Sequence, residues 1–350
     1  MAQRAAQACN ARPGRVTGQA ELRPESPIPE LSGRRAVLVA STGGHLAQLV
    51  QLVTRLDLHE DPLWITFEHP QSLSLLRRAR VAYVPYVASR DYVGLARVLP
   101  RVRSILRHED FDACVSTGAA IALAALPQAR MMGKEAHYIE SVSRFDGPSF
   151  SGRVLSHLPG VKLYTQHAAW ADKNWSFRFS ILQSYEPRAV TPSWIADRPK
   201  VFVTLGTIRP FRFDALVDRL LSVLPPGAEV VWQLGETSRD HLPGTVITTM
   251  PTEEFDRLVT ESDVVVSHSG VGSTLRILEL GKSPVLVPRR ASRGEHVDDH
   301  QAQVADRLSA LGLVTKAEVP QLTMEHLLAA HSTSIDFPPK NDVVSGLKEE

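Results

Sequence analysis

Short apolar runs alternate with amphipathic segments from Arg34 onward. The runs at 36–40, 62–67 and 79–86 are almost continuously apolar, which is typical of strands buried on both faces of a parallel sheet. The segments between them, such as HLAQLVQLV after Gly44, have the spacing of amphipathic helices. This pattern predicts an α/β fold in which helices cover both faces of a parallel sheet.

The same alternation restarts after a segment that contains Pro187, Pro192 and Pro199. We therefore predict two doubly wound, Rossmann-like domains. The first 33 residues are rich in Pro, Arg, Gln and Ala and lack the apolar core of a signal peptide. The predicted division is a disordered leader at 1–33, an N-terminal domain at 34–185, a linker at 186–199, a C-terminal domain at 200–335 and a tail at 336–350.

The composition is that of an ordinary globular protein. Hydrophobic residues make up 43% of the 350-residue chain and charged residues 22%, and the formal net charge of +1 does not indicate nucleic-acid binding. The two cysteines, Cys9 and Cys114, are too few and too far apart for a disulfide framework, which favours a reducing cytoplasm. No apolar run approaches the roughly 20 residues that span a bilayer.

Polar, glycine-containing loops follow several of the predicted strands. Ligands of open α/β sheets bind beyond the carboxyl ends of the strands, so two such sheet edges facing each other would enclose a binding cleft. The loops are Ser41–His45, Ser116–Gly118, Gly206–Thr207, Gly235 and Ser267–Gly270.

The most informative loop is SHSGVGST, at 267–274. Gly270 and Gly272 allow a tight turn and the close approach of a ligand, and the free N–H groups of the following helix start favour an anion such as a diphosphate. The spacing matches neither GxGxxG nor a P-loop, so a plain strand-to-helix turn is the alternative.

Glu279 lies in the last turn of the helix that follows this loop, before Gly281. A carboxylate there opposes the helix dipole by roughly 0.3–1 kcal/mol. It lies about two turns after Gly272, on the same face as the loop, where it could accept hydrogen bonds from two ribose hydroxyls. The alternatives are a solvated glutamate or a partner for Arg276.

Three further motifs have less specific interpretations. His45 opens a helix in STGGH and is placed for proton transfer, or it caps its own loop. His296, Asp298, Asp299 and His300 lie close together, but their spacing fits no zinc pattern and a helix cap is the preferred interpretation. The basic amphipathic segment 94–108 would lie on an anionic membrane or pack on the sheet as a surface helix.

Together these motifs resemble the GT-B glycosyltransferases of family 28, whose members include MurG and the two-subunit UDP-GlcNAc transferase of the dolichol pathway. The resemblance covers about residues 34–320. VLVASTGGHLAQL and YIESVSRFDGPSFSGRVL resemble the acceptor-side subunit, and SDVVVSHSGVGSTLRILELGKSPVLVP resembles the donor-binding subunit. Both blocks lie on one chain here. Relatives with this pairing act in bacterial exopolysaccharide or capsule assembly.

The resemblance implies a role for each matching residue. The donor-binding set is Gly206, Thr207, His268, Ser269, Gly270, Gly272, Ser273, Thr274, Glu279, His300 and Gln301, with the phosphates near the SHSGVGST loop and the ribose on Glu279. The acceptor-binding set is Thr42, Gly43, Gly44, Ser116, Thr117, Gly118, Glu140, Ser141 and Arg144, with His45 as the catalytic base. The pair Arg289-Arg290 departs from the family pattern and suggests a uronic carboxylate on the donor sugar.

The implied reaction is an inverting transfer from a UDP-sugar to a lipid-diphosphate-linked glycan of the undecaprenyl type. No metal or other cofactor is expected, because helix amides would stabilise the leaving UDP. The implied location is the inner face of the cell membrane, with segment 94–108 on the anionic surface. The alternatives are a UDP-GlcNAc 2-epimerase on the same fold and a non-catalytic UDP-sugar-binding subunit. The donor sugar and the linkage stay open.

Overall fold

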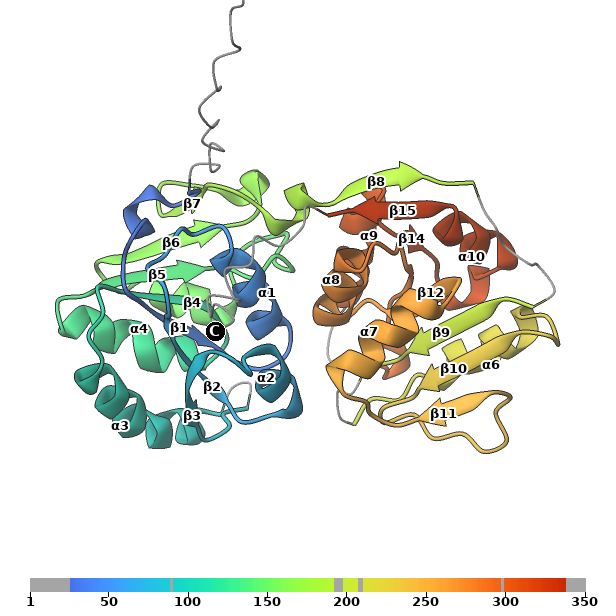
Figure 1. Ribbon diagram of the computed structural model, residues 1–350, viewed down its shortest axis with the longest axis horizontal. Coiled ribbons are helices and arrows are strands. Elements are labelled where there is room, and N and C mark those ends of the chain that lie inside the picture. Colours follow the sequence, from blue (N-terminus) through green and yellow to red (C-terminus); the bar gives the residue numbers. More distant parts are fainter. Residues whose placement is uncertain (1–25, 89–90, 192–197, 207–209, 297–298, 338–350) are drawn as a thin grey trace, which may run out of the picture.

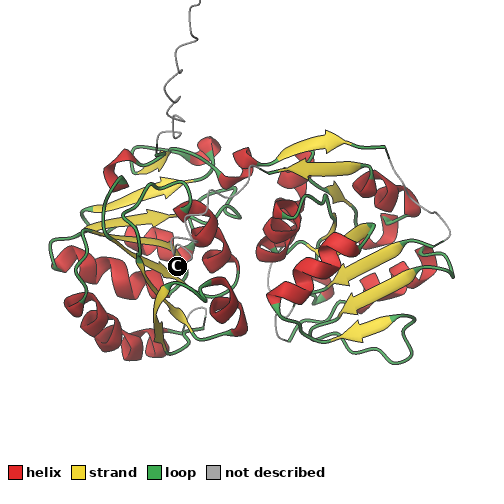
Figure 2. Ribbon diagram, viewed as in Figure 1, coloured by secondary structure: helices red, strands yellow, loops and turns green. Residues whose placement is uncertain are grey.

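The computed structural model describes residues 26–88, 91–191, 198–206, 210–296 and 299–337. They form two α/β domains that lie side by side (Figures 1 and 2), each with a parallel sheet between helices. The prediction of two doubly wound domains is confirmed.

The N-terminal sheet has seven parallel strands in the order β3-β2-β1-β4-β5-β6-β7. The order runs outward in both directions from β1 and β4, so the crevice between their carboxyl ends is the switch point at which such sheets bind ligands. The strands are β1 (Ala36–Ala40), β2 (Leu63–Phe67), β3 (Arg80–Val84), β4 (Ala113–Gly118), β5 (Glu135–Ile139), β6 (Val161–Thr165) and β7 (Trp175–Phe177).

Helices cover both faces of this sheet because its central strands are apolar on both sides. Leu38 and Ala40 of β1 pack with α1 (Gly44–Val53), whereas Val37 and Val39 pack in a cluster with α3 (Tyr92–His108) and α4 (Ile121–Met131). Two short helices complete the domain, α2 (Pro70–Leu75) and α5 (Phe150–Leu155). Helix α3 continues through Pro100 without interruption.

The C-terminal sheet has six parallel strands in the order β11-β10-β9-β12-β13-β14, with its switch point between β9 and β12. The strands are β9 (Lys200–Thr204), β10 (Glu229–Gln233), β11 (Thr245–Ile247), β12 (Val264–His268), β13 (Val285–Val287) and β14 (Thr315–Lys316). The helices are α6 (Asp214–Val223), α7 (Thr252–Glu261), α8 (Val271–Glu279), α9 (His300–Ala310) and α10 (Met324–His331).

A small antiparallel ribbon joins the two domains at one side (Figure 1). It pairs β8 (Glu186–Ala189), which lies in the predicted linker, with β15 (Thr333–Asp336) near the end of the described chain. Phe337 then stacks on Tyr185, with ring centroids 4.9 Å apart. The predicted linker therefore begins with strand β8. Its partner, β15, brings the end of the described chain back to the N-terminal domain.

The predicted disordered leader is wrong for residues 26–33. Ile28 and Leu31 are fully buried in the core around α1, and Pro29–Leu31 form a 3-10 helix. The signal was missed because two apolar side chains in a proline-rich segment show no periodicity. Residues 1–25 lie outside the described residues.

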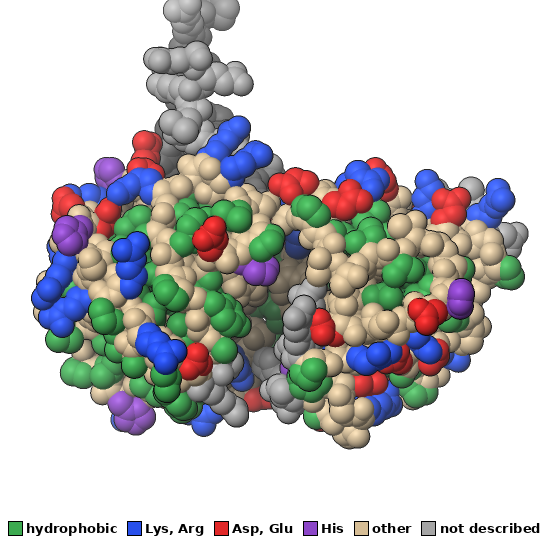
Figure 3. Space-filling model, turned by 90° about the horizontal axis from the view of Figure 1, so that it is seen from below, with side chains coloured by type: hydrophobic (Ala, Val, Ile, Leu, Met, Phe, Trp, Pro, Cys, Tyr) green, Lys and Arg blue, Asp and Glu red, His purple; other side chains and the backbone are tan. Residues whose placement is uncertain are grey.

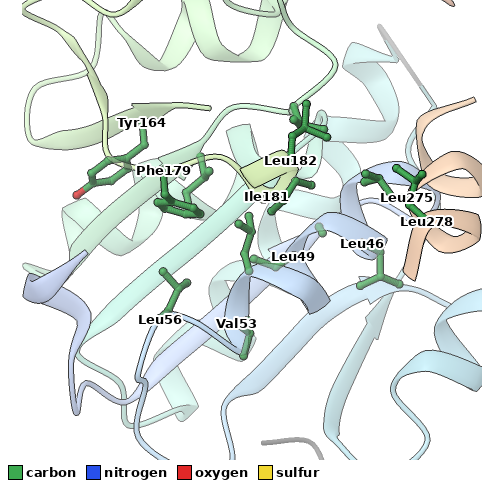
Figure 4. Close-up of a cluster of buried hydrophobic side chains, with 14 of the residues drawn as sticks. Leu46, Leu49, Val53, Leu56, Tyr164, Phe179, Ile181, Leu182, Leu275 and Leu278 are labelled. Atoms are coloured by element: carbon green, nitrogen blue, oxygen red, sulfur yellow. The ribbon is translucent and has the colours of Figure 1, made fainter. Parts of the chain in front are cut away.

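One hydrophobic cluster extends across the domain boundary (Figure 4). Leu46, Leu49 and Val53 of α1 pack in the same cluster as Leu275 and Leu278 of α8. Side chains of α9 from the C-terminal domain also belong to it. Burial of apolar surface therefore holds α1 and α8 against each other and sets the geometry of the site at their N-terminal ends.

Candidate active site

The two switch points face each other across the domain boundary. The loop after β1 contains Gly43, Gly44 and His45, and the loop between β12 and α8 contains Gly270. An ideal Cβ placed on Gly44 would lie only 3.7 Å from the backbone nitrogen of Gly272, so the first turns of α1 and α8 are in close contact. The structure brings these predicted acceptor and donor loops together.

The N-terminal ends of both helices offer unpaired backbone N–H groups. Neither Gly43, which precedes α1, nor Gly270, which precedes α8, contributes a side-chain cap. The first four N–H groups of an α-helix have no intrahelical acceptor, and the helix dipole adds positive potential. Two such helix starts facing one crevice form an electrostatically positive site suited to phosphate groups.

A cavity of about 190 Å³ opens beside this contact, between the two domains. Figure 3 shows the surface hollowed between the two halves of the molecule. The volume is below the roughly 300–1,000 Å³ typical of whole-ligand sites, so in this state it would hold one part of a UDP-sugar. Its lining comes from both domains: Ala47, Val50, Gln51, Gln71, Leu75, Gln233, Met250, Thr252, Phe255, Gly272, Ser273, Arg276 and Glu279.

Glu279 is the last residue of α8 and its carboxylate lies in this cavity wall. The side chain is only 8% exposed and accepts a hydrogen bond from Arg276 Nη1 at 2.5 Å. Gln51 of α1 donates to its other oxygen across the domain boundary. Glu279 is therefore both the partner of Arg276 and a cavity residue, and two of its roughly four lone-pair positions remain for a ligand.

Arg276 is held firmly because it also pairs with Asp256 of α7 through two nitrogens. These hydrogen bonds raise the pKa of Arg276 above its usual value although the residue is largely buried. The resulting Asp256–Arg276–Glu279 chain fixes the orientation of the Glu279 carboxylate without help from a ligand.

His45 lies at the start of α1 on the other side of the crevice. Its Nδ1 lies 2.7 Å from the carbonyl oxygen of Thr117, which can only accept, so Nδ1 carries the proton and a neutral ring leaves Nε2 unprotonated. Burial lowers the pKa of His45, and the positive charge of Arg144 lowers it further, against the opposing hydrogen bond to Thr117. The ring is therefore a neutral base near pH 7.

Most of the other predicted acceptor residues are buried beneath the segment that carries His45. Ser116, Thr117 and Gly118 are buried, and Thr117 Oγ1 also donates to the carbonyl oxygen of His45. Thr42 and Arg144 are half-buried, and the charge of Arg144 acts on His45.

Glu140 is a positioning residue rather than a ligand contact in this structure. Its carboxylate is fully buried and accepts hydrogen bonds from the Ser141 N–H at 3.0 Å and the Ser149 N–H at 2.8 Å. Burial raises its pKa, and these hydrogen bonds oppose the rise. It holds the loop that carries Ser141, itself buried, and Arg144. The prediction that Glu140 and Ser141 contact the acceptor directly is not supported by their burial.

His268, which the resemblance places near the nucleotide phosphates, is buried in this structure and its imidazole is neutral. The imidazole is buried between Gly206 and Gly270, where a Cβ on either glycine would overlap it. Burial, together with the charge of Arg289, lowers the pKa of His268 to about 3. A neutral, enclosed ring cannot supply positive charge to a diphosphate, so its role is to shape the loop before α8.

The remaining donor residues divide into three groups. Gly272 and Ser273 line the cavity. Thr274 is buried and its Oγ1 donates to Gly270 O at 2.8 Å, and Gln301 is buried and accepts from Arg289 N, so both face the protein. Ser269 is also buried, and its Oγ has no partner within the described residues. Thr207 and the side chain of His300 lie outside the described part of the chain.

The two arginines after β13 behave differently from each other. Arg290 pairs with Glu318 at 2.5 Å, so it is not free for a donor sugar. Arg289 is fully buried, donates from Nη2 to Leu205 O at 2.6 Å and lies over the Phe213 ring. Its burial lowers its pKa to about 10. The uronic-carboxylate suggestion therefore concerns Arg289 alone.

Several cavity residues were not predicted from the sequence. Gln51 and Gln71 come from the N-terminal domain, and Gln71 holds Gly43 by hydrogen bonds to its N–H (2.6 Å) and its carbonyl (3.1 Å). One signal was present for Gln51: with Gln48, it is one of two polar residues on the buried, mostly apolar side of α1. Met250 and Phe255 gave no signal, because they follow ordinary helix and loop patterns.

The described residues show neither a metal-binding group nor a membrane-spanning helix. No group of three His, Cys, Asp or Glu side chains in this part of the chain is arranged to hold a metal ion. Asp298 of the acidic and histidine cluster lies outside that part. None of the described helices is long and apolar enough to cross a membrane.

The packing of His268 gives a stability prediction. We expect Gly270→Ala to lower the free energy of unfolding by about 1–3 kcal/mol, because its Cβ must displace the buried imidazole. Gly272→Ala is the matched control, since a Cβ there meets nothing nearer than 3.4 Å. Urea unfolding of both variants measures the difference; equal stabilities would show that the His268 packing is not tight.

Comparison with known proteins identifies the class of fold first. A crystal structure of MurG from Acinetobacter baumannii superimposes with a TM-score of 0.52 at 17% identity, over 84% of this chain and 88% of that chain. At this identity the likeness establishes the fold alone. The molecule has the GT-B fold, in which two Rossmann-like domains face each other across a cleft.

The sequence matches relate part of the chain to a family. Residues 201–336 match the glycosyltransferase family 28 C-terminal domain. A UDP-N-acetylglucosamine transferase subunit ALG13 from Cryptococcus neoformans is 40% identical over 92 residues, which cover 25% of this chain and 44% of that subunit. This chain thus spans less than half of that relative's length. These two matches are likenesses to family 28 glycosyltransferases, and neither covers half of the chain.

A longer match covers both domains. The UDP-N-acetylglucosamine–N-acetylmuramyl-(pentapeptide) pyrophosphoryl-undecaprenol N-acetylglucosamine transferase of Prochlorococcus marinus is 21% identical over 299 residues, 78% of this chain and 83% of that protein. A match of this length must include part of the N-terminal domain as well as the C-terminal domain.

Proposed function

We propose that this protein transfers a sugar, with inversion, from a UDP-sugar to a lipid-diphosphate-linked glycan. The observation that carries the proposal is the meeting of two uncapped helix starts, α1 with His45 in its first turn and α8, beside a cavity whose wall includes Glu279. The arrangement suits two phosphate-bearing substrates, one from each domain, with the reacting atoms between them.

The donor half uses the C-terminal domain. The ribose hydroxyls donate to the free lone pairs of Glu279, and the flat base lies against the apolar wall formed by Met250 and Phe255. The diphosphate reaches the N–H groups at the start of α8, near Gly272. These amides stabilise the negative charge that grows on UDP as it leaves, which removes the need for a metal ion.

The acceptor half uses the N-terminal domain. The acceptor diphosphate lies near the start of α1 and the positive charge of Arg144. The acceptor hydroxyl attacks the anomeric carbon, the bond from that carbon to UDP breaks, and the hydroxyl proton passes to Nε2 of His45. The new glycosidic bond forms on the opposite face of the sugar, which inverts the anomeric centre.

The lipid acceptor is supported by the Prochlorococcus relative, which is named for a pyrophosphoryl-undecaprenol substrate. We place the reaction in exopolysaccharide, capsule or other cell-envelope glycan synthesis, with donor and acceptor halves that are separate subunits in the dolichol pathway fused on one chain. The protein would work from the cytoplasm on the inner face of the membrane.

Incubation with a panel of labelled UDP-sugars and bacterial lipid extract tests this proposal. Label from one UDP-sugar is expected to enter the organic phase as a lipid-linked glycan, and mild acid is expected to release it from the diphosphate. Label that enters only water-soluble glycans would contradict the lipid acceptor, and conversion of the UDP-sugar into its epimer would favour the alternative enzyme.

The apolar face of segment 94–108 was predicted to lie on the membrane, but that face is buried in the structure. A membrane contact must therefore use another surface. The apolar stripe of α3 is in the domain core, where Val98, Val102 and Leu106 are buried. The most exposed large apolar residues of α3 are Tyr92 and Val93 at its start, and Leu99 in its middle is exposed to a smaller degree. The rings of Tyr92 and the exposed Phe150 of α5 meet edge to face, with their centroids 6.3 Å apart. The starts of α3 and α5 therefore share one surface.

This surface is accompanied by exposed basic residues, a combination suited to an anionic membrane. Figure 3 shows hydrophobic and basic side chains interspersed on the N-terminal half. The exposed arginines of the two helices are Arg97, Arg101, Arg103, Arg107 and Arg153.

We expect the double variant Tyr92→Ser and Phe150→Ser to bind phosphatidylglycerol vesicles roughly 10-fold more weakly, because two exposed apolar rings are lost. Sedimentation with vesicles measures this, and added salt should weaken wild-type binding. Leu328→Ser, an exposed apolar position on α10 of the other domain, is the control. Equal binding of all three proteins would remove this surface from the proposal.

A further inference from the structure

The side chain of Gln51 has an unused hydrogen-bond acceptor inside the protein. Gln51 is 7% exposed and lines the cavity between the domains. Its Nε2 donates to Glu279 and, at 3.0 Å, to the hydroxyl of Tyr185. Its Oε1 is buried and has no hydrogen-bond partner within the described residues.

The orientation of this amide is fixed by its neighbours. A carboxylate only accepts, so turning the amide over would place Oε1 against the negative charge of Glu279. Tyr185 anchors the amide from the other side: it is buried and stacked on Phe337. Oε1 therefore stays an acceptor that the protein leaves unsatisfied, at a cost of about 1–3 kcal/mol unless a molecule in the cavity supplies a donor.

Glu279 and Gln51 together present two kinds of acceptor from two domains. The carboxylate retains about two free lone-pair positions after its hydrogen bonds with Gln51 and Arg276. Gln51 Oε1 comes from a side chain in direct hydrogen-bond contact with that carboxylate. Neighbouring acceptors that lack donors fit a ligand with two adjacent hydroxyl groups, and a ribose has such a pair.

We propose that Gln51 is part of the donor ribose site: its Oε1 accepts a hydrogen bond from the 2′-hydroxyl of the ribose while Glu279 accepts from the 3′-hydroxyl. This inference rests on the proposed function and deepens it, because it assigns a donor contact to the acceptor-side domain. The nucleoside then bridges α1 and α8, so the two domains must be together for full donor affinity. The site also discriminates between ribose and deoxyribose.

Calorimetric titration of UDP and 2′-deoxy-UDP tests this contact. Wild-type protein is expected to bind UDP about 10-fold or more tightly than 2′-deoxy-UDP. Gln51→Met conserves volume and removes the acceptor, so the fold should be retained. We expect it to weaken UDP binding about 3- to 10-fold and to leave 2′-deoxy-UDP binding nearly unchanged, so that the preference for ribose shrinks.

The control variant separates this inference from the proposed function. Glu279→Gln should weaken UDP binding whether or not Gln51 contacts the ribose. If Gln51→Met lowers the affinities for UDP and 2′-deoxy-UDP by the same factor, or changes neither, the Gln51 contact is refuted while Glu279 still supports the donor site. If wild-type protein binds no UDP, the proposed function fails and this inference fails with it.

Discussion

Replacing Glu279 with glutamine is expected to weaken UDP binding by about 10- to 100-fold. The carboxylate lies in the cavity wall, is only 8% exposed and is oriented by Arg276. A hydrogen bond to a charged group contributes roughly 1.5–3 kcal/mol, and glutamine removes the charge and half of the acceptor capacity. It also leaves Arg276 with one carboxylate partner, Asp256, so part of the loss comes from a less fixed side chain.

Glu253→Gln is the matched control for this prediction. Glu253 lies at the start of α7 and also reaches across the domain boundary, where it accepts from Ser74 at 3.0 Å, but it does not line the cavity. Calorimetric titration should give wild-type UDP affinity for this variant. Equal affinities for both variants would mean that Glu279 serves only its ion pair with Arg276, which was the alternative interpretation of the sequence.

Replacing His45 with alanine is expected to lower kcat by roughly 100- to 10,000-fold while UDP affinity stays within about twofold of wild type. The loss follows from removing the group that takes the acceptor proton. His59→Ala, at an exposed position of the same domain, should keep full activity. A kcat for His45→Ala that matches wild type would assign the proton transfer to another group.

The pH dependence of kcat gives the second part of this prediction. The base must be unprotonated, and burial and the charge of Arg144 lower the pKa of His45. Activity should therefore persist as the pH falls to 6.5, the ordinary histidine value, and decline only below it. Arg144→Gln removes one cause of the lowered pKa, so the acidic decline should move to higher pH.

Much of the fold followed from the sequence because buried parallel strands have a simple signature. The runs at 36–40, 63–67 and 264–268 are strands in the structure and every residue in them is buried. The ribbon of β8 and β15 could not be predicted in the same way. Its strands, EPRA and TSID, are short and mostly polar, and their pairing joins residues more than 140 positions apart.

The site was predictable where backbone geometry determines it. Glycines at the strand ends, a helix start without a cap and a glutamate at the wrong end of a helix dipole are local signals, and the structure places Gly44, Gly272 and Glu279 around one crevice. The burial of His268 between Gly206 and Gly270 could not be predicted, because only the folded chain brings these residues together. Gln51 was missed because its partner, Glu279, is 228 residues away.

The central claim is that donor and acceptor meet at this crevice and that UDP leaves when they react. Continuous measurement of UDP release, across a panel of UDP-sugars with and without a lipid-diphosphate acceptor, tests it most directly. We expect UDP to accumulate with one donor and only when the acceptor is present. This accumulation should be lost in both His45→Ala and Glu279→Gln. Three results would contradict the central claim. They are UDP release that does not depend on the acceptor, epimerisation of the UDP-sugar without UDP accumulation, and unchanged UDP release by both variants.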